Sequence, residues 1–193
     1  MGLRDAWNND GMTTFFRGQG HPGGDGADRD RDAGEPGSSG GPWPQRSANG
    51  AWPTLIIEAG DSSTLPGLRM DAKWWFSASD HQVKIVLLAK LVRHRRRIIL
   101  EKWVETVQAP RPGPVTRAAA HLANTPQPHC AQEITINWAG NTPNLPASYV
   151  VTSGDLQLDF DLLFLRPPGP TEGDILITVP RLQLWASRVW EVV

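Results

Sequence analysis

The segment WPTLIIEAGDS, residues 52–62, contains the feature that most constrains the fold. Residues 55–57 form an unbroken apolar run, Leu-Ile-Ile, and such a run predicts a strand buried on both faces, as in an α/β sheet. The expected strand covers 54–58 and follows Pro53, which suits a strand start because it has no N–H to donate. The strand ends on a carboxylate, Glu58, followed by alanine and glycine. A buried strand with this ending needs an explanation in chemistry or in packing.

The residues after this strand predict a helix and then two further strands. Ser63 or Thr64 can cap a helix over about 65–78, and a proline falls in its first turn. Its apolar face contains residues at helical spacing: Leu65, Leu68, Ala72 and Trp75. Strands over about 82–92 and 97–107 are joined by the short turn RHRR, so we expect them to form an antiparallel hairpin.

The second half of the chain predicts shorter elements. We expect strands over 132–138, near 156–160 and over 175–179, a helical turn after the second of these, and a C-terminal helix over 180–191. The chain therefore begins strand, helix, strand, strand, and its first strands are apolar on both faces. This pattern predicts one α/β domain with a mixed sheet of about five strands and flanking helices.

Two segments have no apolar periodicity. Residues 1–50 are rich in glycine, and burial of so few apolar groups cannot offset the entropy lost on ordering, so we expect a disordered N-terminal region. Residues 108–131 are rich in proline and small residues and predict a linker or a long surface loop. The single α/β domain is therefore expected to cover 51–193, with the Pro-rich loop inside it.

The composition excludes several classes of protein. One cysteine, Cys130, rules out an intrachain disulfide framework and argues against a Cys-based zinc site. A formal net charge of -1 gives no overall attraction to nucleic acid, so any such attraction must be local. No signal-peptide pattern and no apolar run of membrane-spanning length are present. We expect a soluble intracellular protein without a membrane partner, and both the nucleus and the cytoplasm stay open.

Glu58 is the first candidate for a catalytic or metal-binding residue. A carboxylate at the end of a buried strand must be paired, protonated or bound to a metal ion, and sites in open α/β sheets form at the carboxyl ends of strands. The basic partner of Glu58 is left open among three residues: Lys84 on the following strand, and Arg69 and Lys73 on the helix. A carboxylate and a lysine beside a metal ion suit phosphodiester cleavage. The alternatives are an ordinary turn carboxylate for Glu58 and a solvated helix face, with Asp71 as the partner, for the helical cations.

The basic run RHRRR is a candidate nucleic-acid-binding site. Arg93, Arg95, Arg96 and Arg97 surround the expected hairpin tip. They predict contacts with the phosphates of a nucleic acid, and a solvated turn is the alternative. The chain also contains nine tryptophans. Those on apolar faces are expected in the core or at a partner surface rather than as platforms for base stacking.

One block of the sequence resembles a known group of proteins. WPTLIIEAGDSSTLPGLRMDAKWWFSASDHQVKIVLLAKLVRHRRRIILEKWVE resembles uncharacterised fungal proteins that share WPT, aliphatic residues, E-x-G-x-S-E-S-L-x-x-L-R-x-D-A-R-W-W-L, then V-K-I-V and I-x-I-E-K-W. The later pieces EITI, LQLDFDLLFLR and GDILIT with LQLWASRVW also fit this group. The resemblance covers about 52–107 and 132–190.

More distantly, the strand–E-x-G-x-S–helix unit is similar to the Uma2-like branch of the PD-(D/E)XK nuclease superfamily, which has a restriction-endonuclease-like fold. This resemblance implies a magnesium site made from an upstream aspartate, a glutamate at a strand end and a basic residue. Glu58 matches the glutamate, and Asp61 is a further candidate ligand of the Mg²⁺ ion. Lys84, Lys73 or Arg69 matches the basic residue.

The chain departs from the family pattern at the upstream aspartate. The fungal proteins have E-P-D-S-S before the WPT strand, whereas this chain has Glu35-Pro36-Gly37-Ser38-Ser39, with Gly37 in the place of the aspartate. A single carboxylate holds Mg²⁺ poorly, because such sites need several oxygen ligands. The resemblance therefore implies a degenerate copy that keeps the nuclease-like fold without the activity. The alternatives are a non-enzymatic interaction module, which uses exposed tryptophans and the RHRRR hairpin, and a broken gene copy whose residues 1–50 pack on nothing.

Overall fold

The computed structural model describes residues 15–16, 38–48, 50–107, 125–140 and 143–192. The strands are β1 (Phe15–Phe16), β2 (Ser38–Pro42), β3 (Leu55–Gly60), β4 (Ile85–Val92), β5 (Arg97–Val107), β6 (Pro126–Trp138), β7 (Tyr149–Val151), β8 (Leu156–Leu158) and β9 (Ile175–Ile177). The helices are α2 (Leu65–Ala78), α4 (Phe160–Phe164) and α5 (Val179–Val192), with 3₁₀ turns η1 (Arg93–Arg95) and η2 (Pro146–Ser148). Within these residues, every helix is too short or too polar to cross a lipid bilayer.

The main sheet of the described chain has seven strands in the order β1-β2-β3-β4-β5-β6-β7. β3 and β4 are parallel and the other neighbouring pairs are antiparallel. Parallel neighbours need a crossover connection, and α2 supplies it. β8 and β9 form a separate two-stranded sheet. The expected α/β fold with a mixed sheet and flanking helices is confirmed, with more strands than the expected five or so.

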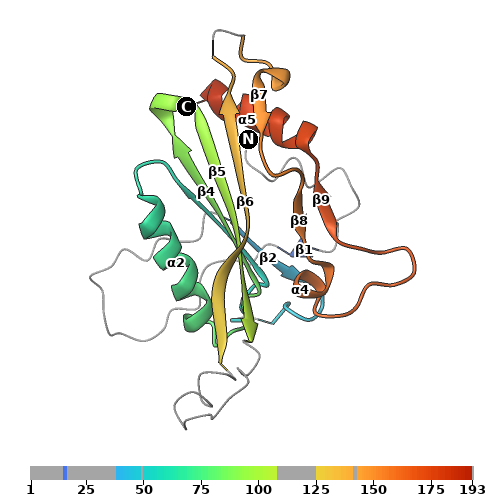
Figure 1. Cartoon of the computed structure of the whole chain (residues 1–193). Helices are drawn as coiled ribbons and strands as arrows, with labels where there is room; N and C mark the ends of the chain where they lie inside the picture. Colours follow the sequence, from blue (N-terminus) through green and yellow to red (C-terminus); the bar gives the residue numbers. More distant parts are fainter. Residues whose placement is uncertain (1–14, 17–37, 49, 108–124, 141–142, 193) are drawn as a thin grey trace, which may run out of the picture.

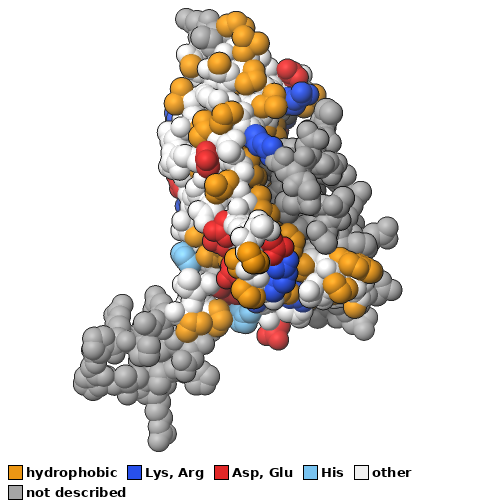
Figure 2. Space-filling view, turned by 90° about the vertical axis from the view of Figure 1, so that its right-hand side faces the viewer, with side chains coloured by type: hydrophobic (Ala, Val, Ile, Leu, Met, Phe, Trp, Pro, Cys, Tyr) orange, Lys and Arg blue, Asp and Glu red, His pale blue; other side chains and the backbone are white. Residues whose placement is uncertain are grey.

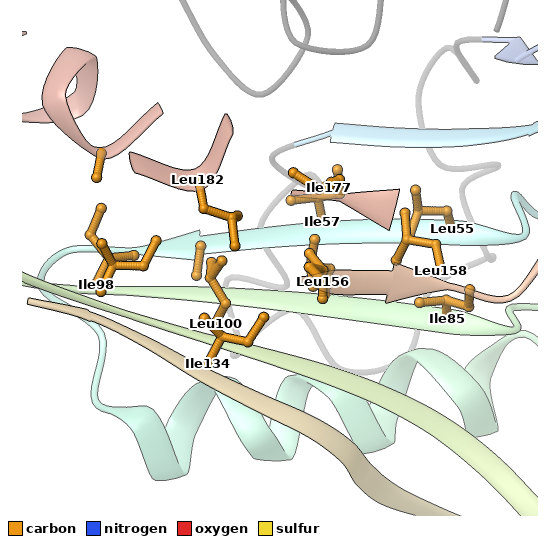
Figure 3. Packing of buried hydrophobic residues seen from close by; sticks show 14 of the residues in the cluster. Leu55, Ile57, Ile85, Ile98, Leu100, Ile134, Leu156, Leu158, Ile177 and Leu182 are labelled. Atoms are coloured by element: carbon orange, nitrogen blue, oxygen red, sulfur yellow. The ribbon is translucent and has the colours of Figure 1, made fainter. Parts of the chain in front are cut away.

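Each face of the sheet has its own apolar core, and Figure 1 shows α2 on one side of the sheet and α5, β8 and β9 on the other. Ile56 packs with α2 on one face, whereas Leu55 and Ile57 belong to a larger core with residues of α5, β8 and β9 on the other. This alternation follows from the two-residue period of a strand. Figure 3 shows sheet residues of the larger core beside those of the second layer: Leu55, Ile57, Ile85, Ile98, Leu100 and Ile134 against Leu156, Leu158, Ile177 and Leu182. The prediction that the first strand is buried on both faces is confirmed.

The predictions for the central helix and hairpin are confirmed. Helix α2 has the predicted bounds, and the hydroxyl of its N-cap Thr64 accepts a hydrogen bond of 3.2 Å from the backbone N–H of Gly67. β4 and β5 form the expected antiparallel hairpin, which turns at η1. The strands and helices expected after residue 150 are present as β8, α4, β9 and α5, although both strands are shorter than expected.

The expectation of disorder up to residue 50 is wrong for residues 38–42. This Gly-rich segment is strand β2, which pairs with the outer edge of β3 from Ser38 opposite Ile57 to Gly40 opposite Leu55. Small residues are needed here, because a Cβ on Gly41 would lie 2.9 Å from the Cβ of Arg46. The expectation that residues 1–50 pack on nothing fails for the same residues. Residues 1–14 and 17–37 lie outside the described chain.

The expectation of a loop over 108–131 is wrong for its last six residues. Residues 126–131 belong to β6, which pairs with β5 as far as Pro126 opposite Val107. Long-range pairing outweighs the poor strand propensity of this stretch. Among the described residues this part of β6 is a sheet edge, because β7 pairs only with 136–138, and prolines within sheets are found on edge strands. Residues 108–124 lie outside the described chain.

Gly60 gives the packing reason for a glycine after the carboxylate. It is the last residue of β3, and a Cβ added there would lie 2.9 Å from Cδ1 of Leu68 and 3.1 Å from Cβ of Ser63. The side chain of Leu68 is 3% exposed, so it has little room to move. The glycine therefore lets α2 pack closely on the end of β3.

We predict that Gly60→Ala lowers the free energy of unfolding by about 1–3 kcal/mol, because the added methyl group overpacks the contact with α2. Urea denaturation followed by tryptophan fluorescence measures this change. Gly173→Ala is the matched control, since a Cβ there meets nothing within 4 Å, and it should change the free energy by no more than about 0.5 kcal/mol. Equal stability of the two variants would contradict the close approach of α2.

Candidate functional site

Three glutamates lie in one row across the α2 side of the sheet. Glu58 of β3 pairs with Leu88 of β4, Leu88 with Glu101 of β5, and Glu101 with Glu133 of β6. Paired residues of neighbouring strands point to the same face, and Leu88 belongs to the cluster that packs with α2. The row therefore brings three carboxylates to the face where the predicted basic residues of α2 also lie.

Glu101 is the most buried charge of this row, with 0% of its side chain exposed. The guanidinium of Arg69 donates to both of its oxygens, from Nε at 3.1 Å and 3.0 Å and from NH2 at 2.5 Å. The indole Nε1 of Trp103 donates to Oε2 at 2.8 Å. Hydrogen bonding to this carboxylate raises the pKa of Arg69 above its ordinary value. Glu101 is thus a desolvated carboxylate whose charge is balanced within the protein.

Glu58 is also engaged by a donor from α2. Its Oε1 accepts a hydrogen bond of 2.8 Å from Nε1 of Trp75, and its side chain is half-buried. Trp75 is 4% exposed and makes edge-to-face contacts with Trp52 and Trp74. Glu58 is therefore part of the β3–α2 interface rather than a carboxylate in an open turn.

The three candidate basic residues have different partners. Arg69 extends to Glu101 rather than to Asp71, and its NH2 also lies 3.8 Å from a carboxylate oxygen of Glu133. The Nζ of Lys73 lies 5.9 Å from the centre of the Trp103 ring, as a cation–π contact.

Lys84 lies away from Glu58. Its Nζ donates to the carbonyl of His81 at 2.7 Å. Glu58 pairs with Leu88 of β4. Lys84 comes four residues before Leu88, and four residues span about 13 Å along a strand. Of the candidate basic residues, the structure therefore brings Arg69 and Lys73 to the carboxylate row and leaves Lys84 at the opposite end of the strand.

Asp61, the second candidate metal ligand, is bound by the hairpin. The Nε of Arg93 donates to its Oδ2 at 2.6 Å, and Lys90 donates to its backbone carbonyl. The hydrogen bond from Arg93 is the main cause that lowers the pKa of the Asp61 carboxyl below its ordinary value. Asp61 thus joins the end of β3 to the tip of the β4–β5 hairpin.

These carboxylates do not form a donor set for Mg²⁺. Glu58 and Glu101 are two strands apart, or about 10 Å, and each already has a partner in the protein. In the described residues, no three Asp, Glu, His or Cys side chains are grouped so that they could hold a metal ion. Gly37, which stands where the resemblance implies an aspartate, lies outside those residues.

The hairpin tip places the RHRRR run at the end of β4 and β5. The side chains of Arg93, His94 and Arg95 in η1 are exposed. Arg96 has a left-handed backbone (φ 43°), and its guanidinium lies 4.9 Å from the centre of the Trp138 ring. The Nε of Arg97 donates to Oδ1 of Asn137 at 2.6 Å. The tip thus combines exposed cations with two arginines whose orientation is fixed by contacts with β6.

The sequence analysis did not identify the importance of Glu101 and Lys102. Lys102 is 8% exposed and forms an ion pair of 2.9 Å with Asp159 on the opposite face of the sheet. The sequence did contain a signal for this arrangement. Two adjacent residues of opposite charge, Glu101 and Lys102, interrupt the apolar run of β5, and adjacent residues of a strand point to opposite faces of the sheet. Buried charges of this kind need partners.

Cys130 lies near the carboxylate row on β6 and its side chain is exposed. Partial desolvation, together with the negative charges of Glu101 and Glu133, raises the pKa of its thiol. A thiol with a raised pKa is a weak nucleophile at neutral pH. The environment of Cys130 therefore does not favour nucleophilic catalysis.

We predict that Arg69→Met lowers the free energy of unfolding by about 3 kcal/mol, because it leaves the buried Glu101 carboxylate without its counter-charge. Chemical denaturation measures the change, and Arg188→Met, at an exposed position of α5, is the control. The double variant Arg69→Met/Glu101→Gln should recover most of the loss, since it removes the charge and keeps an acceptor for Trp103. A double variant as unstable as the single one would show that the ion pair is not the cause.

Comparisons with models of known protein families, with functionally curated proteins and with solved structures give no match.

Proposed function

We propose that this protein is a non-enzymatic binding module that binds nucleic acid through the tip of the β4–β5 hairpin, and that its α/β frame is a degenerate copy of a nuclease-like fold. The proposal rests on one contrast. The carboxylates near the predicted catalytic residues are bound within the protein, and Glu101 is 0% exposed. At the hairpin tip, Arg93 keeps 58% of its side chain exposed although it is paired with Asp61, and Arg95 beside it is exposed.

The partners of the carboxylates support the loss of catalysis. A catalytic carboxylate must reach a metal ion or a substrate. Glu101 has three hydrogen bonds from Arg69 and one from Trp103 and is closed to solvent. Asp61, the other candidate ligand beside Glu58, is bound by Arg93. Replacing these contacts with a metal ion would require breaking hydrogen bonds that stabilise the fold.

The geometry of the tip supports phosphate binding. Arg93 has 58% of its side chain exposed although it is paired with Asp61, and Arg95 is exposed beside it. The fixed guanidinium groups of Arg96 and Arg97 lie next in the chain. Exposed arginines at the end of a rigid hairpin can approach a nucleic-acid backbone, and each phosphate contact releases counterions. Because the contacts are to phosphates, binding of this kind has little sequence preference.

We predict that Arg93→Ala/Arg95→Ala weakens binding to a short fluorescein-labelled DNA duplex by at least about tenfold at low salt, because it removes two phosphate contacts. The slope of log K against log salt should fall by about 2. Fluorescence anisotropy measures both quantities. Arg166→Ala/Arg188→Ala removes the same number of charges away from the tip and is the control. Equal weakening by both double variants would contradict a site at the tip.

A magnesium-dependent nuclease is the competing candidate, and the position of Glu58 near the carboxyl end of parallel strand β3 favours it. We predict that calorimetric titration with Mg²⁺ and with Mn²⁺ gives the same weak heat for the wild type and for Glu58→Gln, since several oxygen ligands are needed. The variant keeps an acceptor for Trp75, so it separates metal binding from folding. Saturable binding that is lost in Glu58→Gln would favour the nuclease and call for cleavage assays.

A further inference from the structure

The connection between α4 and β9 is an exposed proline-rich loop. It covers 165–174 with the sequence LRPPGPTEGD, and the side chains of Pro167, Pro168 and Pro170 are all exposed. The loop projects from the molecule beside β9 in Figure 1, and Figure 2 looks onto this side, where acidic, basic and hydrophobic side chains lie close together. Neither apolar core includes a residue of 166–174.

The backbone of this loop has little conformational choice. Each proline fixes its own φ near −65°, and each residue before a proline is restricted to the β and polyproline II regions. Arg166, Pro167 and Gly169 all precede a proline. Pro167 meets both restrictions at once, which leaves the polyproline II conformation. Residues 167–169 belong to no helix or turn, and a turn begins at Pro170, where the N–H of Glu172 donates to the carbonyl of Gly169 at 3.1 Å. The stretch from Pro167 to Pro170 is therefore restricted toward the polyproline II conformation before any partner binds.

Both ends of the segment are anchored by Glu172. Its carboxylate accepts hydrogen bonds of 2.6 Å from NH1 and 2.6 Å from NH2 of Arg166, and of 2.8 Å from the backbone N–H of Gly169. These contacts, with the hydrogen bond from Arg166 first, lower the pKa of Glu172 to about 2. The Arg166 guanidinium also lies 4.8 Å from the centre of the Phe160 ring in α4. The loop is thus held by contacts of Arg166 and Gly169, while the side chains of its prolines stay exposed.

We propose that this loop is a docking segment for a small domain with an aromatic-lined proline-recognition groove, of the SH3 or WW kind. Such grooves take a polyproline II ligand through two prolines separated by two residues. Pro167 and Pro170 have this spacing, and three residues per turn place them on the same side of the segment, about 9 Å apart. Pro168 points to another side.

The contacts of the loop favour this partner over an acidic one. Glu172 already neutralises Arg166, so the segment offers an apolar proline ridge rather than a free cation. A segment fixed before binding loses little entropy when the complex forms, which is the advantage of polyproline II ligands. This surface is separate from the arginines of the hairpin tip, and its function does not depend on nucleic-acid binding.

The test uses the full chain against a panel of purified SH3 and WW domains, with affinity measured by biolayer interferometry. We expect at least one domain to bind the wild type and to lose about tenfold or more in affinity for Pro167→Ala/Pro170→Ala. Pro168→Ala is the matched control in the same loop and should change the affinity by less than about threefold. Anisotropy with the labelled DNA duplex should be the same for all of these variants.

Three outcomes would overturn the proposal: no binding by any domain of the panel, binding that Pro167→Ala/Pro170→Ala leaves unchanged, or an equal loss for Pro168→Ala. Because the substituted side chains are exposed, the variants should keep the thermal transition of the wild type, which circular dichroism checks. An altered transition would be answered with Pro170→Ala alone, whose unchanged affinity in a folded protein would also overturn the proposal.

Discussion

The ion pair between Arg69 and Glu101 is the interaction on which the arrangement of helix and sheet depends. A carboxylate with 0% exposure in the middle of a sheet is tolerated only with its charge balanced and its oxygens hydrogen-bonded. Arg69 meets this need only when α2 lies across β4 and β5 in its observed position. The charge therefore fixes the orientation of a helix that apolar contacts alone would fix less sharply.

Strand β5 connects both layers of the protein through two adjacent residues of opposite charge. Glu101 points to α2 and pairs with Arg69, whereas Lys102 points to the other face and pairs with Asp159 at the start of α4. The hydroxyl of Thr54 adds a second link to α4, since it donates to the carbonyl of Leu163 at 2.9 Å. Each face of the sheet thus carries a charged pair from β5 within largely apolar packing.

Local signals in the sequence predicted the central elements well. Helix α2 could be bounded from its cap at Thr64 and its early proline, and the β4–β5 hairpin from two apolar strands with a short turn. The same reasoning missed β2 and the start of β6, because both depend on pairing with strands that are distant in the sequence. The candidate site was harder to predict than the strands. Tertiary structure decides to which face of the sheet Glu101 points and which helix covers that face. Glu58 was found from its position, but its partner Trp75 was expected in the core or at a partner surface and not as a hydrogen-bond donor to Glu58.

The overhang of β6 beyond β7 has a consequence for the behaviour of the protein at high concentration. An open strand edge offers unpaired N–H and C=O groups that can recruit the edge of another molecule and begin aggregation. Pro126 and Pro128 lie in this overhang among the described residues, and proline is one of the residues by which natural proteins blunt a sheet edge. The same prolines that obscure the strand in the sequence thus act as gatekeepers, and they keep a long hairpin arm from becoming a template for intermolecular sheet growth.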